Sequence, residues 1–154
     1  MVAAAIFLLL AASARGAPPV PARLLQALER DVGGALAQLE TLRAAPPEDG
    51  GAEAPATLLG IADGSAEAAM ATMATTIRAL RRRLITLDTA VRKLGDPRLA
   101  QIVFIMKGEL DRLAGALAHA RNAPDRKTRQ EALARLEYGL VQLDGATAAL
   151  WTFD

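Results

Sequence analysis

Apolar residues in the middle of the chain recur at alternating spacings of three and four. They are Met70, Met73, Ile77, Leu80, Leu84, Leu87, Val91 and Leu94. A strict period of 3.5 residues keeps an apolar stripe facing a second helix only if the two helices wind around each other with a left-handed twist. The segment therefore predicts a long helix that needs helical neighbours.

Three further segments, at 21–45, 97–122 and 125–150, carry apolar stripes at the same spacing. We call all four stripes seams. The residues of the three further seams are Leu25, Leu28, Val32, Ala35, Leu39 and Leu42; Leu99, Val103, Met106, Leu110, Leu113, Leu117 and Ala120; and Leu133, Leu136, Leu140, Leu143, Thr147 and Leu150. Thr147 is the one polar residue among them and none is charged, so we expect an interior without ionised groups. Burying each large side chain contributes about 1.5 to 3 kcal/mol before entropy is subtracted, which is enough to hold one domain together.

Pro, Ser and Gly residues between the seams predict where each helix begins and ends, and therefore how the helices connect. Pro46 and Pro47 end the first helix, and Ser65 is a suitable N-cap for the second, which stops at Gly95. Tight connections follow at 95–97 and 122–125, so the second, third and fourth helices are expected to be antiparallel neighbours. The predicted fold is all-α: an antiparallel four-helix bundle, up-down-up-down, with a mobile loop at 46–64 that is long enough to allow a crossover as well.

The composition agrees with helices packed through small and aliphatic side chains. The chain has 154 residues, of which 52% are hydrophobic but only 3% aromatic, and a formal net charge of +1. Alanine and leucine favour helix, and the residues that fill strands are scarce. The absence of a strong basic excess interleaved with aromatic residues argues against nucleic-acid binding.

The N-terminus has the pattern of a secretory signal. An apolar run at 2–12 is followed by Ala12-Ser13-Ala14, a small-x-small cleavage motif, although no Lys or Arg precedes the run. We predict a signal peptide at 1–14, a short Pro-rich segment at 15–20 and a single bundle domain at 21–154, exported to the periplasm or secreted. The run is shorter than the roughly 20 residues of a membrane span, so no integral span is expected. An uncleaved segment that tethers a structural subunit to the membrane is the alternative.

The residue inventory argues against an enzyme. Downstream of the predicted signal the chain has no Cys, one Ser (Ser65) and one His (His119), which excludes the usual nucleophile and base arrangements, di-iron Glu-x-x-His pairs and Cys-x-x-Cys-His haem attachment. No cofactor is expected. Opposite charges four residues apart predict ordinary surface ion pairs within one helix. These pairs are Asp88 with Arg92, Lys107 with Asp111, Asp125 with Arg129, and Glu131 with Arg135.

A hairpin closed near Gly95 would bring Met70 and Met73 close to His119. Two thioethers and an imidazole could hold Cu(I), and one Met with the His could ligate haem iron. The alternative interpretation is that the methionines are core residues and that His119 faces solvent.

Arg78, Arg81, Arg82 and Arg83 flank the longest seam and could contact an acidic partner or anionic lipid headgroups. Alternatively, their aliphatic stems cover the seam while the charges stay hydrated. Trp151 and Phe153 after the last seam are expected either to close the end of the bundle or to contact another subunit.

In topology the predicted bundle resembles the periplasmic four-helix cytochromes. The first helix has no methionine and the fourth no histidine, where the b-type members would present axial ligands, so the resemblance implies architecture alone. We expect an exported, non-enzymatic helix bundle that acts as a binding or accessory module for a protein partner, with homo-oligomerisation through helix faces as a further possibility. The alternatives are a copper or haem carrier using Met70, Met73 and His119, and a membrane-tethered subunit.

Overall fold

The chain forms four long helices. The computed structural model describes residues 20–44 and 56–153, and for residues 56–65 it describes the backbone. The helices are α2 (Ala22–Ala44), α3 (Ala56–Leu94), α4 (Pro97–Arg121) and α5 (Arg126–Trp151). No strand occurs in 20–44 or 56–153, so the all-α prediction is confirmed. The predicted signal peptide at 1–14 and most of the Pro-rich segment at 15–20 lie outside the described residues.

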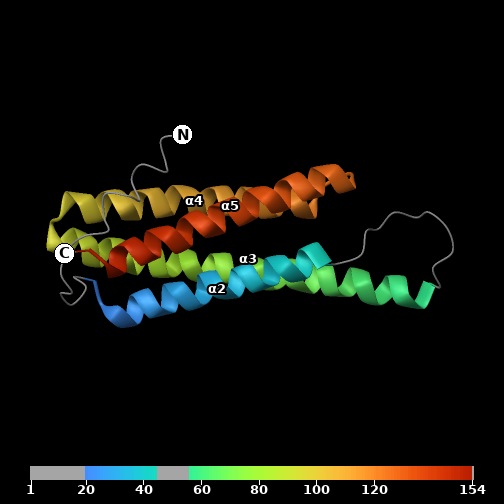
Figure 1. Cartoon of the computed structure of the whole chain (residues 1–154), viewed down its shortest axis with the longest axis horizontal. Coiled ribbons are helices and arrows are strands. Elements are labelled where there is room, and N and C mark those ends of the chain that lie inside the picture. Colours follow the sequence, from blue (N-terminus) through green and yellow to red (C-terminus); the bar gives the residue numbers. More distant parts are fainter. Residues whose placement is uncertain (1–19, 45–55, 154) are drawn as a thin grey trace.

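Consecutive helices run antiparallel and pack as a closed ring (Figure 1). The packed pairs are α2 with α3, α3 with α4, α4 with α5, and α5 with α2. Each helix thus packs against two neighbouring helices, one on either side of its buried face. The predicted up-down-up-down bundle is confirmed, and the crossover topology is not the one adopted.

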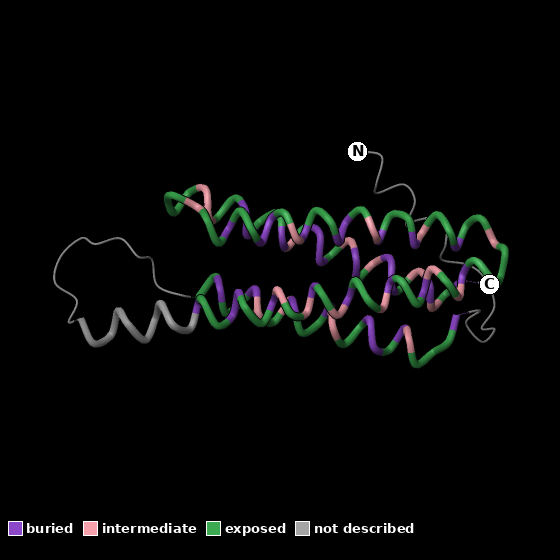
Figure 2. The backbone as a smooth tube through the Cα atoms, turned by 180° about the vertical axis from the view of Figure 1, so that it is seen from behind, coloured by how far each residue is buried: buried purple, intermediate pink, exposed green. Residues whose placement is uncertain are grey.

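The four seams form the core. Every seam residue is buried except Leu94, which is 48% exposed, and Figure 2 shows buried positions alternating with exposed ones along each helix. The prediction for Leu94 is wrong because this residue is the last of α3, where the helix has already passed the end of the packed region. Thr147 is fully buried, and its hydroxyl donates a hydrogen bond to the Leu143 carbonyl at 2.8 Å, which satisfies its polar atom without a partner helix.

Local capping chemistry sets the two tight turns. Gly95 has φ +71°, a left-handed conformation that closes α3 without Cβ strain. Asp96 then caps α4 by accepting from the Arg98 N–H at 2.8 Å, with Pro97 as the first helical residue. At the other turn Asp125 accepts from the Thr128 N–H at 2.8 Å. Both predicted turns are therefore confirmed.

Helix α3 begins at Ala56, nine residues before the predicted cap at Ser65. The predicted loop at 46–64 is therefore too long at its C-terminal end, while residues 45–55 lie outside the described residues. The later start was expected because the connection is polar and rich in Gly and Pro and because Ser65 is a suitable N-cap. Gly60 and Gly64 nevertheless lie within α3, each at a cost of about 1 kcal/mol relative to alanine. Within α2, Gly33 and Gly34 are accommodated in an unbroken helix.

The aromatic residues after the last seam close one end of the bundle. Phe153 is buried, and the Arg98 guanidinium lies 4.8 Å from the centre of its ring, a cation–π distance. Trp151 is partly buried against the core. Of the two roles predicted for these residues, closure of the bundle end is the one observed. None of the helices in the described part of the chain is long and apolar enough to cross a membrane.

Candidate binding groove between α4 and α5

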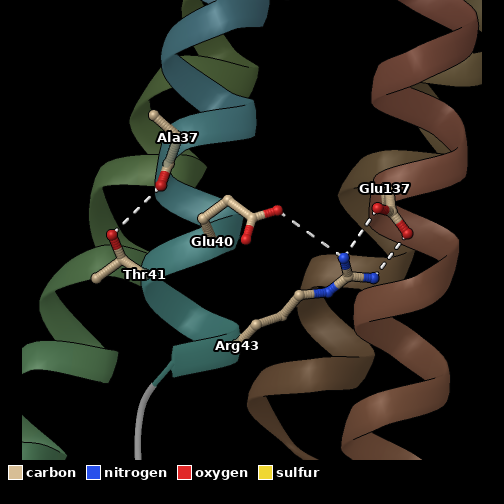
Figure 3. Close-up of polar contacts among 5 residues, drawn as sticks. All are labelled: Ala37, Glu40, Thr41, Arg43 and Glu137. Atoms are coloured by element: carbon tan, nitrogen blue, oxygen red, sulfur yellow. Dashed lines mark hydrogen bonds and ion pairs between the residues drawn. The ribbon is translucent and has the colours of Figure 1, made fainter.

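Charged side chains flanking the seams pair between helices. Arg43 of α2 forms two hydrogen bonds with the Glu137 carboxylate of α5, at 2.8 and 2.6 Å (Figure 3). Lys107 of α4 pairs with Asp88 of α3 at 2.8 Å, and Arg121 of α4 pairs with Glu67 of α3. These contacts join neighbouring helices at their solvated edges and leave the core apolar.

The ion pairs shift the pKa of several groups. The hydrogen bonds from Arg43 lower the pKa of the Glu137 carboxyl and raise that of Arg43 itself, against a smaller opposing effect of burial. Lys107, with help from Arg92, lowers the pKa of Asp88. The direction of each shift means that the ion pair stabilises the charged form of the side chain in the folded protein.

Two of the four arginines predicted to contact a partner are engaged within the bundle. Arg83 donates to Asp31 of α2 at 2.5 Å, and Arg81 donates to Asp111 of α4 at 2.6 Å. The Asp31 side chain is only 17% exposed, so this contact lies at the edge of the core. The two side chains therefore reach in opposite directions from α3 to its two neighbours.

The other two arginines point outward. Arg78 donates to the Thr75 hydroxyl at 3.1 Å on its own helix, and Arg82 is exposed, with no ion pair to any described residue. The structure thus does not gather the four guanidinium groups into one site. Contact with a partner or with lipid stays a prediction, which Arg78 and Arg82 would have to carry.

The three predicted metal ligands lie in different surroundings. Met73 is fully buried and Met70 is 7% exposed, both within the core cluster. His119 is exposed and lines a groove toward α5. No group of three or more His, Cys, Asp or Glu side chains within the described ranges could hold a metal ion. The copper or haem hypothesis stays a prediction, although the imidazole faces α5 and not the methionines of α3.

The groove that contains His119 runs along the outer face of the α4–α5 pair and has a volume of about 630 Å³. Its lining residues are Glu109, Arg112, Gly115, Ala116, His119, Ala134, Arg135 and Tyr138. On α4, Arg112, Gly115 and His119 are three or four positions apart, as are Ala134 and Tyr138 on α5, so each set shares one face of its helix; Ala116 and Arg135 lie directly beside them in sequence. Gly115, Ala116 and Ala134 have little or no side chain, which leaves the space between the helices open.

Glu109 forms the deep end of the groove. It is 7% exposed, contrary to the expectation that no charged residue is buried. Its carboxylate accepts a hydrogen bond from Arg112, one turn later on α4, and this partner offsets the cost of burying the charge. Gly139 of α5 lies beside this carboxylate, since an added Cβ at that position would be 3.9 Å from Glu109 Oε2, an ordinary contact distance. The carboxylate thus lies between α4 and α5, at the edge of the core.

The end of the hairpin beside the groove is basic. Residues 112–135 carry six Lys and Arg residues against two acidic ones, Asp125 and Glu131, a net charge of +4, although the whole chain has only +1. Of these cations, Arg135 lines the groove, is exposed, and forms no ion pair with the described residues. Lys127 is exposed in the first turn of α5. The groove therefore lies beside a stretch of chain with more cationic than acidic side chains.

Apolar side chains extend the same face beyond the groove. Tyr138 is 57% exposed and Val141, one turn further along α5, is 52% exposed. On α4, Ile105 is 37% exposed and lies two turns before Arg112 on the same face. An exposed apolar strip around a groove is typical of an interaction surface.

Comparison with models of known families, with curated proteins and with solved structures gave no match for this chain. The class of the protein, an antiparallel four-helix bundle, therefore rests on the fold described above.

The groove was not predicted from the sequence. A signal was present, because residues 105, 108, 112, 115 and 119 of α4 form a second stripe at heptad spacing on the face opposite the seam. This stripe combines glycines with polar residues, and a periodicity analysis of hydrophobic residues does not detect it.

Proposed function

We propose that the protein is an exported, non-enzymatic binding module whose contact surface is the α4–α5 groove. The observation that carries the proposal is the groove itself, in which exposed Tyr138, Arg135 and His119 surround a floor of small residues. The seams are filled by aliphatic side chains, so a ligand is expected on the outside of the bundle. A concave surface with a few polar groups at its rim is a usual form of binding site.

The proposal is tested by blocking the groove without disturbing the core. Ala134 is exposed and lines the groove, so Ala134→Trp would fill it at little cost to the fold. Ala71→Trp is the matched control, because Ala71 is also an exposed helical alanine but lies on α3. Proteins cross-linked to the tagged chain in its native source are compared by mass spectrometry.

The expected result is a partner recovered with the original chain and with Ala71→Trp, and lost with Ala134→Trp. Both variants should give the same helical circular dichroism as the original. A partner recovered equally with both variants would contradict the proposal, because its binding would not depend on the groove.

The proposed export has its own test. We expect the chain isolated from its native source to begin at Arg15 or Ala17, after cleavage behind Ala14 or Gly16. Intact-mass spectrometry of cell fractions measures this directly. A full-length chain confined to the cytoplasm would contradict export, and a full-length chain in the membrane fraction would support the tethered alternative.

A further inference from the structure

We propose that the α4–α5 groove takes an acidic amphipathic helix from a partner protein, packed along the hairpin as a fifth helix. This inference rests on the proposed function and specifies its partner by chemistry. It draws on three observations that are independent of each other: the shape of the groove, the apolar side chains along it, and the charge around it.

The shape suits a helix. The groove lies between two antiparallel helices, and its lining positions repeat along α4 at helical spacing. Gly115 has nothing within 4 Å of where a Cβ would be, so the helix surface there is open. With small residues at this position and at Ala116 and Ala134, another helix can approach to the 8–10 Å axis separation typical of packed helices.

The apolar side chains along the groove match the narrow apolar face of an amphipathic helix. Tyr138 and Val141 border it on α5, and Ile105 continues the face on α4. Binding modes in which a helix lies in a groove use apolar anchors at positions i, i+3, i+4 and i+7 of the ligand. A helix with such anchors would cover these side chains, which the bundle itself leaves exposed.

The charge selects an acidic helix. The groove is lined by Arg112, Arg135, His119 and Glu109; Arg112 and Glu109 pair with each other, so Arg135 is the lining cation without an ion pair to the described residues. Residues 112–135 as a whole carry a net charge of +4. Rim charges of this kind chiefly set association rate and partner choice, so the preference for acidic ligands should weaken with added salt.

A second copy of the chain fits this surface less well. An isologous dimer places the same patch on both sides of the interface. Two α4–α5 faces brought together would oppose their basic regions, and like charges across an interface disfavour the contact. A lipid surface would meet the basic turn but would leave the floor of the groove uncovered.

The experiment is selection of displayed peptides of about 15 residues, a length that supports a helix. A random library is selected on the mature chain, with depletion on Ala134→Trp. Enriched peptides are then measured by fluorescence anisotropy against the original chain, Ala71→Trp, Arg135→Glu and Arg82→Glu. Arg82 is the matched charge control, since it is exposed on α3 and outside the groove.

We expect enriched peptides with an excess of Asp and Glu and apolar residues at helical spacing, which gain helical circular dichroism when bound. Their affinity should fall at least tenfold with Ala134→Trp and several-fold with Arg135→Glu, and should change little with Ala71→Trp or Arg82→Glu.

Peptides that depend on the groove but are neutral, basic or extended when bound would overturn this inference. The proposed function would stand in that case, because the groove would still be a binding surface. If no peptide depends on the groove, both this inference and the proposed function fail. A dimer in sedimentation that Ala134→Trp abolishes would replace the partner helix by a second copy. Binding to anionic vesicles that Ala134→Trp leaves unchanged, without groove-dependent peptides, would replace it by lipid.

Discussion

Gly139 shows how one missing side chain determines the contact between two helices. A Cβ at this position would lie 2.8 Å from Leu113 Cδ2 and 3.1 Å from Leu113 Cγ. Leu113 is itself fully buried, so its side chain would have to shift within the core to admit the added Cβ. The close approach of α5 to Leu113 of α4 therefore depends on this glycine.

We therefore expect Gly139→Ala to lower the free energy of unfolding by about 1–2 kcal/mol. Overpacking costs about 1–3 kcal/mol, and the higher helix propensity of alanine returns up to about 1 kcal/mol. Urea denaturation followed by circular dichroism measures the change. The control is Gly34→Ala in α2, where nothing lies within 4 Å of the added Cβ, and we expect it to stabilise the protein by about 0.5–1 kcal/mol. Equal effects of both substitutions would show that the α4–α5 contact has room for a methyl group.

Among the helices, α3 makes ion pairs with both of its neighbours. Arg83 pairs with α2, and Arg81 and Asp88 pair with α4. Two of these residues belong to the arginine run that the sequence suggested as a partner site. The run thus has two kinds of member: Arg81 and Arg83, which join helices, and Arg82, which faces solvent.

A double-mutant cycle on Asp31 and Arg83 tests this structural role. We expect Asp31→Asn and Arg83→Gln to be coupled by about 0.5–1 kcal/mol, the upper part of the range for partly exposed ion pairs. Arg82→Gln is the control and should change the free energy of unfolding by less than about 0.5 kcal/mol. Coupling indistinguishable from zero would mean that the Asp31–Arg83 contact does not hold α2 against α3.

The sequence predicts each helix better than the contacts between helices. Heptad spacing identified the buried face of all four helices, and the breaks at 95–97 and 122–125 identified two of the turns, which Asp96 and Asp125 cap in the structure. The predicted ion pair between Lys107 and Asp111 is wrong. Lys107 instead pairs with Asp88 of α3, and Asp111 pairs with Arg81 of α3. The spacing of residues along one helix does not determine how far that helix is shifted along its axis relative to its neighbour. This axial register decides which charged side chains at the helix edges lie close enough to pair.

At the scale of the whole molecule, carboxylates with a lowered pKa link stability to pH. Asp88, Asp96, Asp125 and Glu137 all have a folded-state pKa below the ordinary value, chiefly through hydrogen bonds from Lys107, Arg98, Thr128 and Arg43, respectively. Each group therefore binds protons more weakly in the folded than in the unfolded state. Its contribution to stability is present above the unfolded pKa, near 4, and is lost as the pH falls through the folded pKa.

We expect the melting temperature to be nearly constant from about pH 6 to 8 and to fall below about pH 4.5. Glu137→Gln should lower the melting temperature at pH 7 and make the acid decline shallower, because the ion pair with Arg43 is already lost. Asp144→Asn, at an exposed carboxylate without an ion pair to the described residues, is the control and should leave the profile unchanged. Differential scanning fluorimetry across this pH range measures all three chains. An unchanged acid slope in Glu137→Gln would exclude Glu137 as a contributor.

The candidate site was less predictable than the fold, since it depends on the assembled molecule. His119, Arg135 and Tyr138 meet only because α4 and α5 pack at one particular register. His119 stands out in the sequence as the chain's one histidine, but the methionines predicted to join it, Met70 and Met73, lie in the core. Glu109 lies outside the four seams, so the hydrophobic pattern gave no indication that it is buried.

The even number of antiparallel helices places residue 20 and residue 153 at the same end of the bundle, and the turn between α4 and α5 at the opposite end (Figure 1). The length of α5, 26 residues or roughly 39 Å at 1.5 Å per residue, separates the two ends. A label, a surface or a fused domain attached directly at residue 20 or residue 153 is thus held away from the basic turn. Sensors and fusion proteins joined to the bundle at these two residues leave the groove open to solution.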